Sequence, residues 1–139
     1  MKIKIVEDKD KELWISIDKH VDEEGFKNRV FTKTGYVLWD DDENPVGLFC
    51  YCSLWGKTPF LNFLFVQEEY RQKGYGTQAM NQWEEAMKKQ GYKLTLISTQ
   101  VDETAQHFYR KIGYVDCGGL VLNDTPLNQP MEMFMRKVL

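Results

Sequence analysis

The sequence predicts a single domain, residues 1–139, of the α+β or mixed α/β class. Strand-like apolar runs are interleaved with helix-like amphipathic segments, and most of the strands follow one another closely enough to form a meandering sheet. The chain contains no internal repeat, low-complexity segment or linker. Its length suits one domain with a hydrophobic core of its own.

The first half of the chain predicts a strand, two helices and a hairpin. Asp8 can cap the first helix, on which Leu13 and Ile17 share a face. The second helix is short and is interrupted by Gly25. Two strands joined by a polar turn then predict a hairpin. The expected elements are a strand over residues 2–6, helices over 8–19 and 21–31, and strands over 36–39 and 46–54.

The second half predicts four strands and two helices. Its first strand is apolar at every position but Asn62, which suits a strand covered on both faces. Its first helix is the clearest of the chain, because Met80, Trp83 and Met87 fall within a narrow arc. Its second helix follows Asp102, which can cap it. The expected elements are strands over residues 60–66, 93–99, 114–122 and 133–138, and helices over 76–90 and 103–112.

A glycine-rich segment, R-Q-K-G-Y-G-T at residues 71–77, lies between a predicted strand and the clearest helix. A P-loop needs a lysine before the Ser or Thr at the helix start, and this segment has none there. A dinucleotide fingerprint needs a third glycine. A pyrophosphate held by main-chain amides at a helix N-terminus fits better. Gly74 and Gly76 would let oxygens approach the main chain, and Arg71 and Lys73 add positive charge. An ordinary turn, whose glycines only supply a positive φ, is the other interpretation.

Two segments together resemble the GNAT superfamily of acetyl-CoA-dependent N-acyltransferases. R-x-x-G-x-G at residues 71–76 is similar to the family signature Q/R-x-x-G-x-G/A, and it follows a strand that ends in Val66. D-E-T-A-Q-H-F-Y-R-K-I-G-Y at residues 102–114 resembles the family segment N-x-x-A-x-x-x-Y-x-K-x-G-F. The resemblance implies a GNAT fold. Such a fold has a mixed, mostly antiparallel sheet of six to seven strands flanked by about four helices, and the fourth and fifth strands splay apart to hold acetyl-CoA.

The resemblance also implies which residues hold the coenzyme. Main-chain groups of Leu64 and Val66 would pair with the acetyl and pantetheine amides. Asp102 occupies a slot where the family often has an asparagine that contacts pantetheine, but an ionised Asp accepts hydrogen bonds and cannot donate them. Its other role would be the helix cap. The expected pyrophosphate contacts are Arg71, Gln72, Lys73, Gly74, Tyr75, Gly76 and Thr77.

By the same resemblance, Tyr109 matches the general acid of the family. A phenol with a pKa of about 10 is protonated at neutral pH and can donate a proton to the departing thiolate. The amine would attack the thioester directly, so Cys50 and Cys52 are not nucleophile candidates. The family often carries a catalytic glutamate where this chain has Phe60, and water can carry the amine's proton instead. A core aromatic residue is the alternative for Tyr109, because it lies on the apolar face of its helix.

The resemblance places the amine acceptor near several less specific residues. His20, Glu23 and Glu24 lie in the segment that usually lines the acceptor side, and Trp55 flanks a turn nearby. The loop over residues 123–130 shapes either the acceptor site or a homodimer contact in this family. The function predicted is an N-acetyltransferase for a small primary amine. The alternatives are an acyl-CoA-binding GNAT-like sensor without turnover and a phosphate-binding protein for nucleotides.

Composition argues against other partners. The net charge is −3 with no basic patch, which disfavours nucleic acid. No apolar run approaches the ~20 residues of a membrane span, and the N-terminus lacks a secretion signal, so we expect a cytoplasmic protein. Three cysteines and two histidines show no zinc-type spacing, which predicts reduced thiols and no metal.

The acidic runs at residues 22–24 and 40–43 indicate a solvated helix end and a turn, or a field that draws a cationic acceptor. His107 falls on the helix face opposite Tyr109 and should be solvated.

Overall fold

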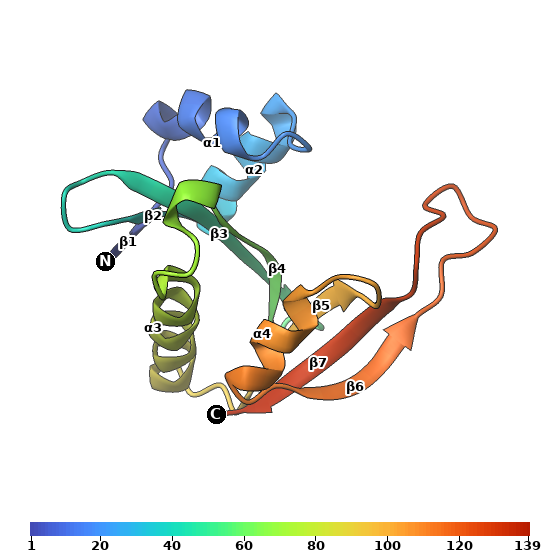
Figure 1. The fold of residues 1–139 in the computed structure, drawn as a ribbon. Helices are drawn as coiled ribbons and strands as arrows, with labels where there is room; N and C mark the ends of the chain where they lie inside the picture. The colour runs from blue at the N-terminus through green and yellow to red at the C-terminus, as the bar shows by residue number, and fades with distance from the viewer. The chain divides into compact units, whose positions relative to one another are not determined.

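A computed structural model describes the whole chain from Met1 to Leu139 (Figure 1). Hydrogen bonding joins seven strands in the order β1-β2-β3-β4-β5-β7-β6. β4 and β5 run parallel, whereas β1–β2, β2–β3, β5–β7 and β6–β7 are antiparallel pairs. The fold class is therefore mixed α+β, as predicted.

The strands are β1 Lys2–Ile5, β2 Gly35–Trp39, β3 Pro45–Leu54, β4 Thr58–Val66, β5 Leu94–Gln100, β6 Val115–Leu120 and β7 Glu132–Val138. The α-helices are α1 Lys11–Ile17, α2 Glu23–Thr32, α3 Tyr75–Lys89 and α4 Ala105–Lys111, and two 3-10 helices are η1 Asp8–Asp10 and η2 Glu68–Tyr70. None of these helices combines the length and the apolar character needed to cross a membrane.

The chain forms two compact units. The first unit comprises Met1–Cys52 and Asn62–Trp83, and the second unit comprises Ser53–Leu61 and Glu84–Leu139. The boundary between the units therefore falls inside β4 and inside α3. That residues 1–139 behave as a single domain stays a prediction.

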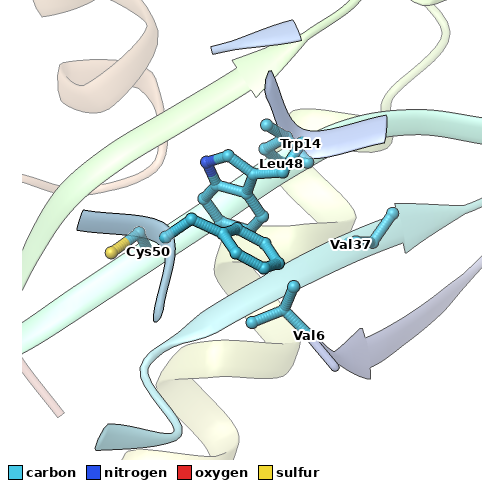
Figure 2. Close-up of a cluster of buried hydrophobic side chains, with 6 residues drawn as sticks. Val6, Trp14, Val37, Leu48 and Cys50 are labelled. Atoms are coloured by element: carbon cyan, nitrogen blue, oxygen red, sulfur yellow. The ribbon is translucent and has the colours of Figure 1, made fainter. Parts of the chain in front are cut away.

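In the first unit, one face of the sheet packs against α1 and α2. Val37 of β2 and Leu48 and Cys50 of β3 point to this face, where they are buried with Trp14 and Phe26. Figure 2 shows Val6, Val37, Leu48 and Cys50 gathered around Trp14. Because side chains alternate along a strand, the residues between them must point the other way.

The opposite face of the first unit carries an aromatic cluster. Tyr36 of β2 stacks on Tyr51 of β3 with ring centroids 6.0 Å apart, and Phe49 lies edge-on to Trp83 of α3 at 5.5 Å. Burial raises the pKa of Tyr36 well above its usual value. Met80 is also fully buried here, which confirms the apolar arc predicted for this helix.

The second unit is built around β5, which lies between β4 and β7. Phe60 of β4 stands opposite Leu96, and Ile97 of β5 stands opposite Met135 of β7. Ile97 and Met135 are fully buried. β6 forms the edge of this sheet with all six residues exposed, and the loop that follows it extends away from the strands before β7 begins (Figure 1).

Three predicted features near helix starts are wrong, and side-chain contacts explain two of them. Asp8 does not cap the first helix, because residues 8–10 form η1 and Asp10 accepts a hydrogen bond from the Glu7 amide at 2.9 Å. Gly25 does not interrupt α2, because it lies in the first turn and donates its N–H to the Asp22 carboxylate at 2.7 Å. Asp102 does not cap α4, which begins three residues later with Thr104 at the N-cap position.

β4 also differs from the prediction. It begins at Thr58, two residues before the predicted start, so Pro59 lies inside the strand and is buried. The expectation of a strand covered on both faces is wrong at Asn62, whose side chain is exposed.

Candidate functional site

The segment between β4 and α3 has an unusual main-chain path. After η2, Gln72 has φ +60° and Gly74 has φ +83°, both in the left-handed region. Glycine adopts this region without strain, whereas a residue such as glutamine rarely does. Turns of this kind can orient successive N–H groups into a concave anion site. We call residues 71–77 the phosphate loop.

The N-terminus of α3 supplies further free donors. The first intrahelical hydrogen bond runs from the Gln78 N–H to the Gly74 carbonyl at 3.0 Å. The N–H groups of Tyr75, Gly76 and Thr77 precede that bond, so they have no acceptor within the helix. The helix dipole also favours an anion at this end. Gly76 lies inside the helix and has no positive φ, unlike Gly74.

The cationic side chains of the phosphate loop lie against aromatic rings. Arg71 donates its Nε–H to the Val66 carbonyl at 2.9 Å, and its guanidinium lies 5.3 Å from the centre of the Phe65 ring. The Lys73 ammonium lies 5.4 Å from the centre of the Tyr70 ring. Both cations stay exposed. Arg71 therefore links the loop to the end of β4 through its Nε–H. Its two Nη groups take no part in this hydrogen bond.

The acidic run at residues 40–43 closes the turn between β2 and β3. Asp40 accepts hydrogen bonds from the side chain and the amide of Asn44 at 2.9 and 2.8 Å, and these bonds lower its pKa. Glu43 pairs with Lys2 at 2.8 Å and Lys4 at 3.1 Å, which lowers the pKa of Glu43 as well. These contacts favour the first interpretation of the run, a solvated turn.

That turn also acts on the start of α3. Burial raises the pKa of Tyr75, and the carboxylates of Asp40 and Asp41 raise it further. Tyr75 packs edge-on against Tyr70 with centroids 6.3 Å apart. The negative turn therefore lies within electrostatic range of the phosphate loop.

Tyr109, the predicted general acid, lies on α4 in the second unit. It is 7% exposed and packs edge-on against Phe108 at 5.1 Å and Tyr114 at 5.8 Å. Burial raises the pKa of Tyr109 to about 12, and the Glu103 carboxylate contributes to the rise. The phenol is therefore neutral and keeps its proton at neutral pH.

A buried polar network lies next to Tyr109, and the sequence did not predict it. The Tyr114 hydroxyl and the Thr95 hydroxyl share a hydrogen bond of 3.1 Å. The Lys137 ammonium pairs with the Glu84 carboxylate at 2.6 Å and lies 5.8 Å from the centre of the Tyr114 ring. The position of Glu84 could have been predicted from its spacing. It lies four residues after Met80, which puts its carboxylate on the apolar side of α3.

The other predicted coenzyme contacts are distributed as follows. Leu64 and Val66 are half-buried in β4, and the Val66 carbonyl accepts the hydrogen bond from Arg71. Asp102 is exposed in a turn that the Glu103 N–H closes onto the Gln100 carbonyl at 3.0 Å. His107 is exposed, which confirms its predicted surface position.

The residues predicted near the acceptor are exposed. Glu23 pairs with Lys11 at 2.6 Å, which lowers the pKa of Glu23, whereas His20 and Glu24 are solvated. Trp55 is 77% exposed and has φ +53° at the tip of the turn that joins β3 to β4, where the Lys57 N–H bonds to the Leu54 carbonyl at 3.0 Å.

The cysteines and metal ligands add no second site. All three cysteines are free thiols, and burial raises the pKa of Cys50, which keeps that thiol protonated and unreactive. The structure holds no group of three or more His, Cys, Asp or Glu side chains that could bind a metal.

Comparison with known proteins identifies the class of enzyme. The profile of the acetyltransferase (GNAT) family matches residues 4–114, which is most of the chain. The chain therefore belongs to this family and is an enzyme of the acyltransferase class. No curated protein sequence matches it.

Solved structures share the whole fold at low identity. Ard1 from Thermoplasma volcanium is 17% identical with a TM-score of 0.83, over 99% of this chain and 97% of that protein. The ribosomal-protein-alanine N-acetyltransferase from Brucella melitensis is 16% identical with a TM-score of 0.78, over 100% of both chains. A GNAT family acetyltransferase from Elizabethkingia anophelis, solved with acetyl-CoA bound, is 16% identical with a TM-score of 0.76, over 99% of this chain and 97% of that one.

Proposed function

We propose that this enzyme transfers an acetyl group from acetyl-CoA to a small primary amine by direct attack. The observation that carries the proposal is the phosphate loop. Its left-handed Gln72 and Gly74 stand next to unbonded amides at the N-terminus of a fifteen-residue helix. Such a loop suits a pyrophosphate, and coenzyme A contains one. The bound acetyl-CoA of the Elizabethkingia relative supports the same ligand here.

The coenzyme contacts follow the family resemblance. Main-chain groups of Leu64 and Val66 pair with the acetyl and pantetheine amides, and Asp102 lies at the pantetheine. The amides and cations from Arg71 to Thr77 hold the pyrophosphate. The exposed main chain at Gly74 fits this role, because only the Gln78 side-chain amide lies near its Cβ position, at 3.7 Å.

Tyr109 is the proposed general acid. The amine nitrogen attacks the thioester carbonyl, the carbon–sulfur bond breaks, and the thiolate takes the proton of the Tyr109 phenol. The phenolate left on Tyr109 then regains a proton from water. The ammonium proton leaves to water, because Phe60 stands where the family often has a glutamate. The raised pKa of Tyr109, about 12, means that the phenol holds its proton at neutral pH.

The acidic runs do not argue for a cationic acceptor. Asp22 caps α2, Glu23 pairs with Lys11, and Glu43 pairs with two lysines. Each run therefore has carboxylates that are engaged by local partners within the first unit.

A second candidate is an acyl-CoA-binding protein without turnover. It is favoured because Phe60 replaces the catalytic glutamate that the family often has at this position. Calorimetric titration with CoA, acetyl-CoA and ATP tests the ligand, and we expect micromolar binding of the first two only. Thiol release from acetyl-CoA with a panel of primary amines then tests turnover. Binding without release from any amine would support the sensor, and no CoA binding would contradict both candidates.

A further inference from the structure

One glycine of β3 has no room for any side chain. A Cβ atom built on Gly47 would lie 2.2 Å from the carbonyl oxygen of Phe65 and 3.2 Å from the Cα of Val66. Both atoms belong to the main chain of β4, so no rotation of a side chain could relieve the overlap. Gly47 is itself buried.

This close approach lies where the sheet is irregular: Leu38 of β2 stands opposite Gly47, but the next residue, Trp39, stands opposite Pro45, so Val46 is an extra residue of β3. In a regular sheet, side chains stand perpendicular to the sheet while carbonyls point along it toward the neighbouring strand. At Gly47 the Cβ direction meets a carbonyl of β4 instead, so the two main chains depart from this regular arrangement here. The next carbonyl, that of Val66, accepts the hydrogen bond from Arg71 of the phosphate loop.

Two hydrogen bonds hold the chain just beyond this point. The Gln67 N–H bonds to the Val46 carbonyl at 2.9 Å, and the Gln67 side-chain amide bonds to the Pro45 carbonyl at 2.6 Å. The start of β3 therefore contacts three successive residues of the strand end from which the phosphate loop departs. Every contact lies within the first unit.

We infer that Gly47 is a positioning residue for coenzyme A binding, a role that rests on the proposed function of the phosphate loop. It acts through Phe65 and Val66, which set where residues 71–77 stand. Any side chain at Gly47 displaces the strand end, and the loop moves with it. Amides displaced in this way no longer meet the pyrophosphate oxygens with good hydrogen-bond distances and angles.

The test is Gly47→Ala, with Gly35→Ala as the matched control. Gly35 is also buried in the sheet of the first unit, but its added methyl would meet only side chains, of Val6, Arg29 and Trp14. We expect Gly47→Ala to raise the KM for acetyl-CoA and the Kd for CoA at least about tenfold. Its kcat at saturating acetyl-CoA should change by less than about threefold. A defect in folding alone would lower the apparent kcat, because a smaller fraction of the protein would be active, and it would leave KM unchanged. This is the result expected of Gly35→Ala.

A second variant keeps the inference testable if Gly47→Ala does not fold. Gln67→Met removes the donor to the Pro45 carbonyl and keeps the length of the side chain, and exposed Gln82→Met is its control. We expect about a threefold rise in Kd for CoA with Gln67→Met and none with Gln82→Met. If the wild type binds CoA and the folded variants bind it equally well, the inference is wrong. If the wild type itself does not bind CoA, the proposed function fails first.

Discussion

The phosphate loop and the helix that carries Tyr109 do their proposed work with different parts of the chain. Residues 71–74 of the loop are exposed, and its amide donors belong to the main chain. Tyr109 is 7% exposed, and its proton belongs to a side chain. A main-chain site depends on φ angles and on the absence of side chains, whereas a side-chain site depends on one atom and its surroundings. Substitutions should therefore weaken ligand binding in the first region and the chemical step in the second.

The two regions also differ in what supports them. The loop is fastened by contacts that end on carbonyls, from Arg71 to Val66 and from Gln67 to Pro45. Tyr109 is packed between aromatic rings, and its neighbour Tyr114 is held by Thr95 and lies beside Lys137. A single hydrogen bond of the loop can be removed by one substitution at modest cost in stability. Removing an aromatic ring beside Tyr109 would leave a cavity and destabilise the fold.

The largest effect is expected from Tyr109→Phe. It removes the proton and keeps the ring, so kcat with a competent amine should fall about 100- to 1,000-fold. The Kd for CoA should stay within about twofold, because the loop is untouched. Steady-state kinetics and calorimetry measure the two quantities. An unchanged kcat would mean that Tyr109 is a core aromatic residue and not the general acid. A large rise in the Kd for CoA would mean that Tyr109 also serves coenzyme binding.

High pH should destabilise the protein through Tyr109. Its pKa is about 12 in the folded protein and about 10 when unfolded, so its contribution is complete below pH ~10 and is lost as the pH rises toward 12. Two pKa units correspond to roughly 3 kcal/mol. Urea unfolding of the wild type and of Tyr109→Phe between pH 8 and about 11.5 measures this loss, because the phenylalanine variant lacks it. If the unfolding free energies of the two proteins fell in parallel with pH, Tyr109 would titrate like a solvated phenol.

The smallest effect is expected from Gly74→Ala. Alanine at φ +83° is strained, which should cost about 1–2 kcal/mol of unfolding free energy. Gly91→Ala is the matched control, because Gly91 has φ +92° and nothing lies within 4 Å of an added Cβ. Both variants should lose similar stability, but only Gly74→Ala should raise the Kd for CoA, by about five- to tenfold. Equal Kd values would show that Gly74 serves the turn alone.

The types and order of the elements could be predicted because they depend on local periodicity. Met80 and Trp83 confirmed their helix face, since burial follows from spacing alone. The helix starts could not be predicted as well. Asp10 and Thr104 take the N-cap positions, although their residue types are no better suited to them than Asp8 and Asp102.

The site was predictable only where residue type signals geometry. Gly74 marked the left-handed turn because glycine is the usual residue there. Gln72 adopts the same region without any such signal, and only the surrounding loop imposes it. Gly47 carries no such signal in the sequence, because the carbonyl that excludes a side chain comes from Phe65, eighteen residues away.

Trp55 gives the molecule an optical reporter at one defined place. Of the four tryptophans, Trp14 and Trp83 are 0% and 4% exposed, whereas Trp55 is 77% exposed at the tip of its turn. A soluble quencher such as iodide therefore reaches this indole before the buried ones. Loss of that quenching on addition of an amine or a second protein would show that the tip has become covered, without any label attached to the chain.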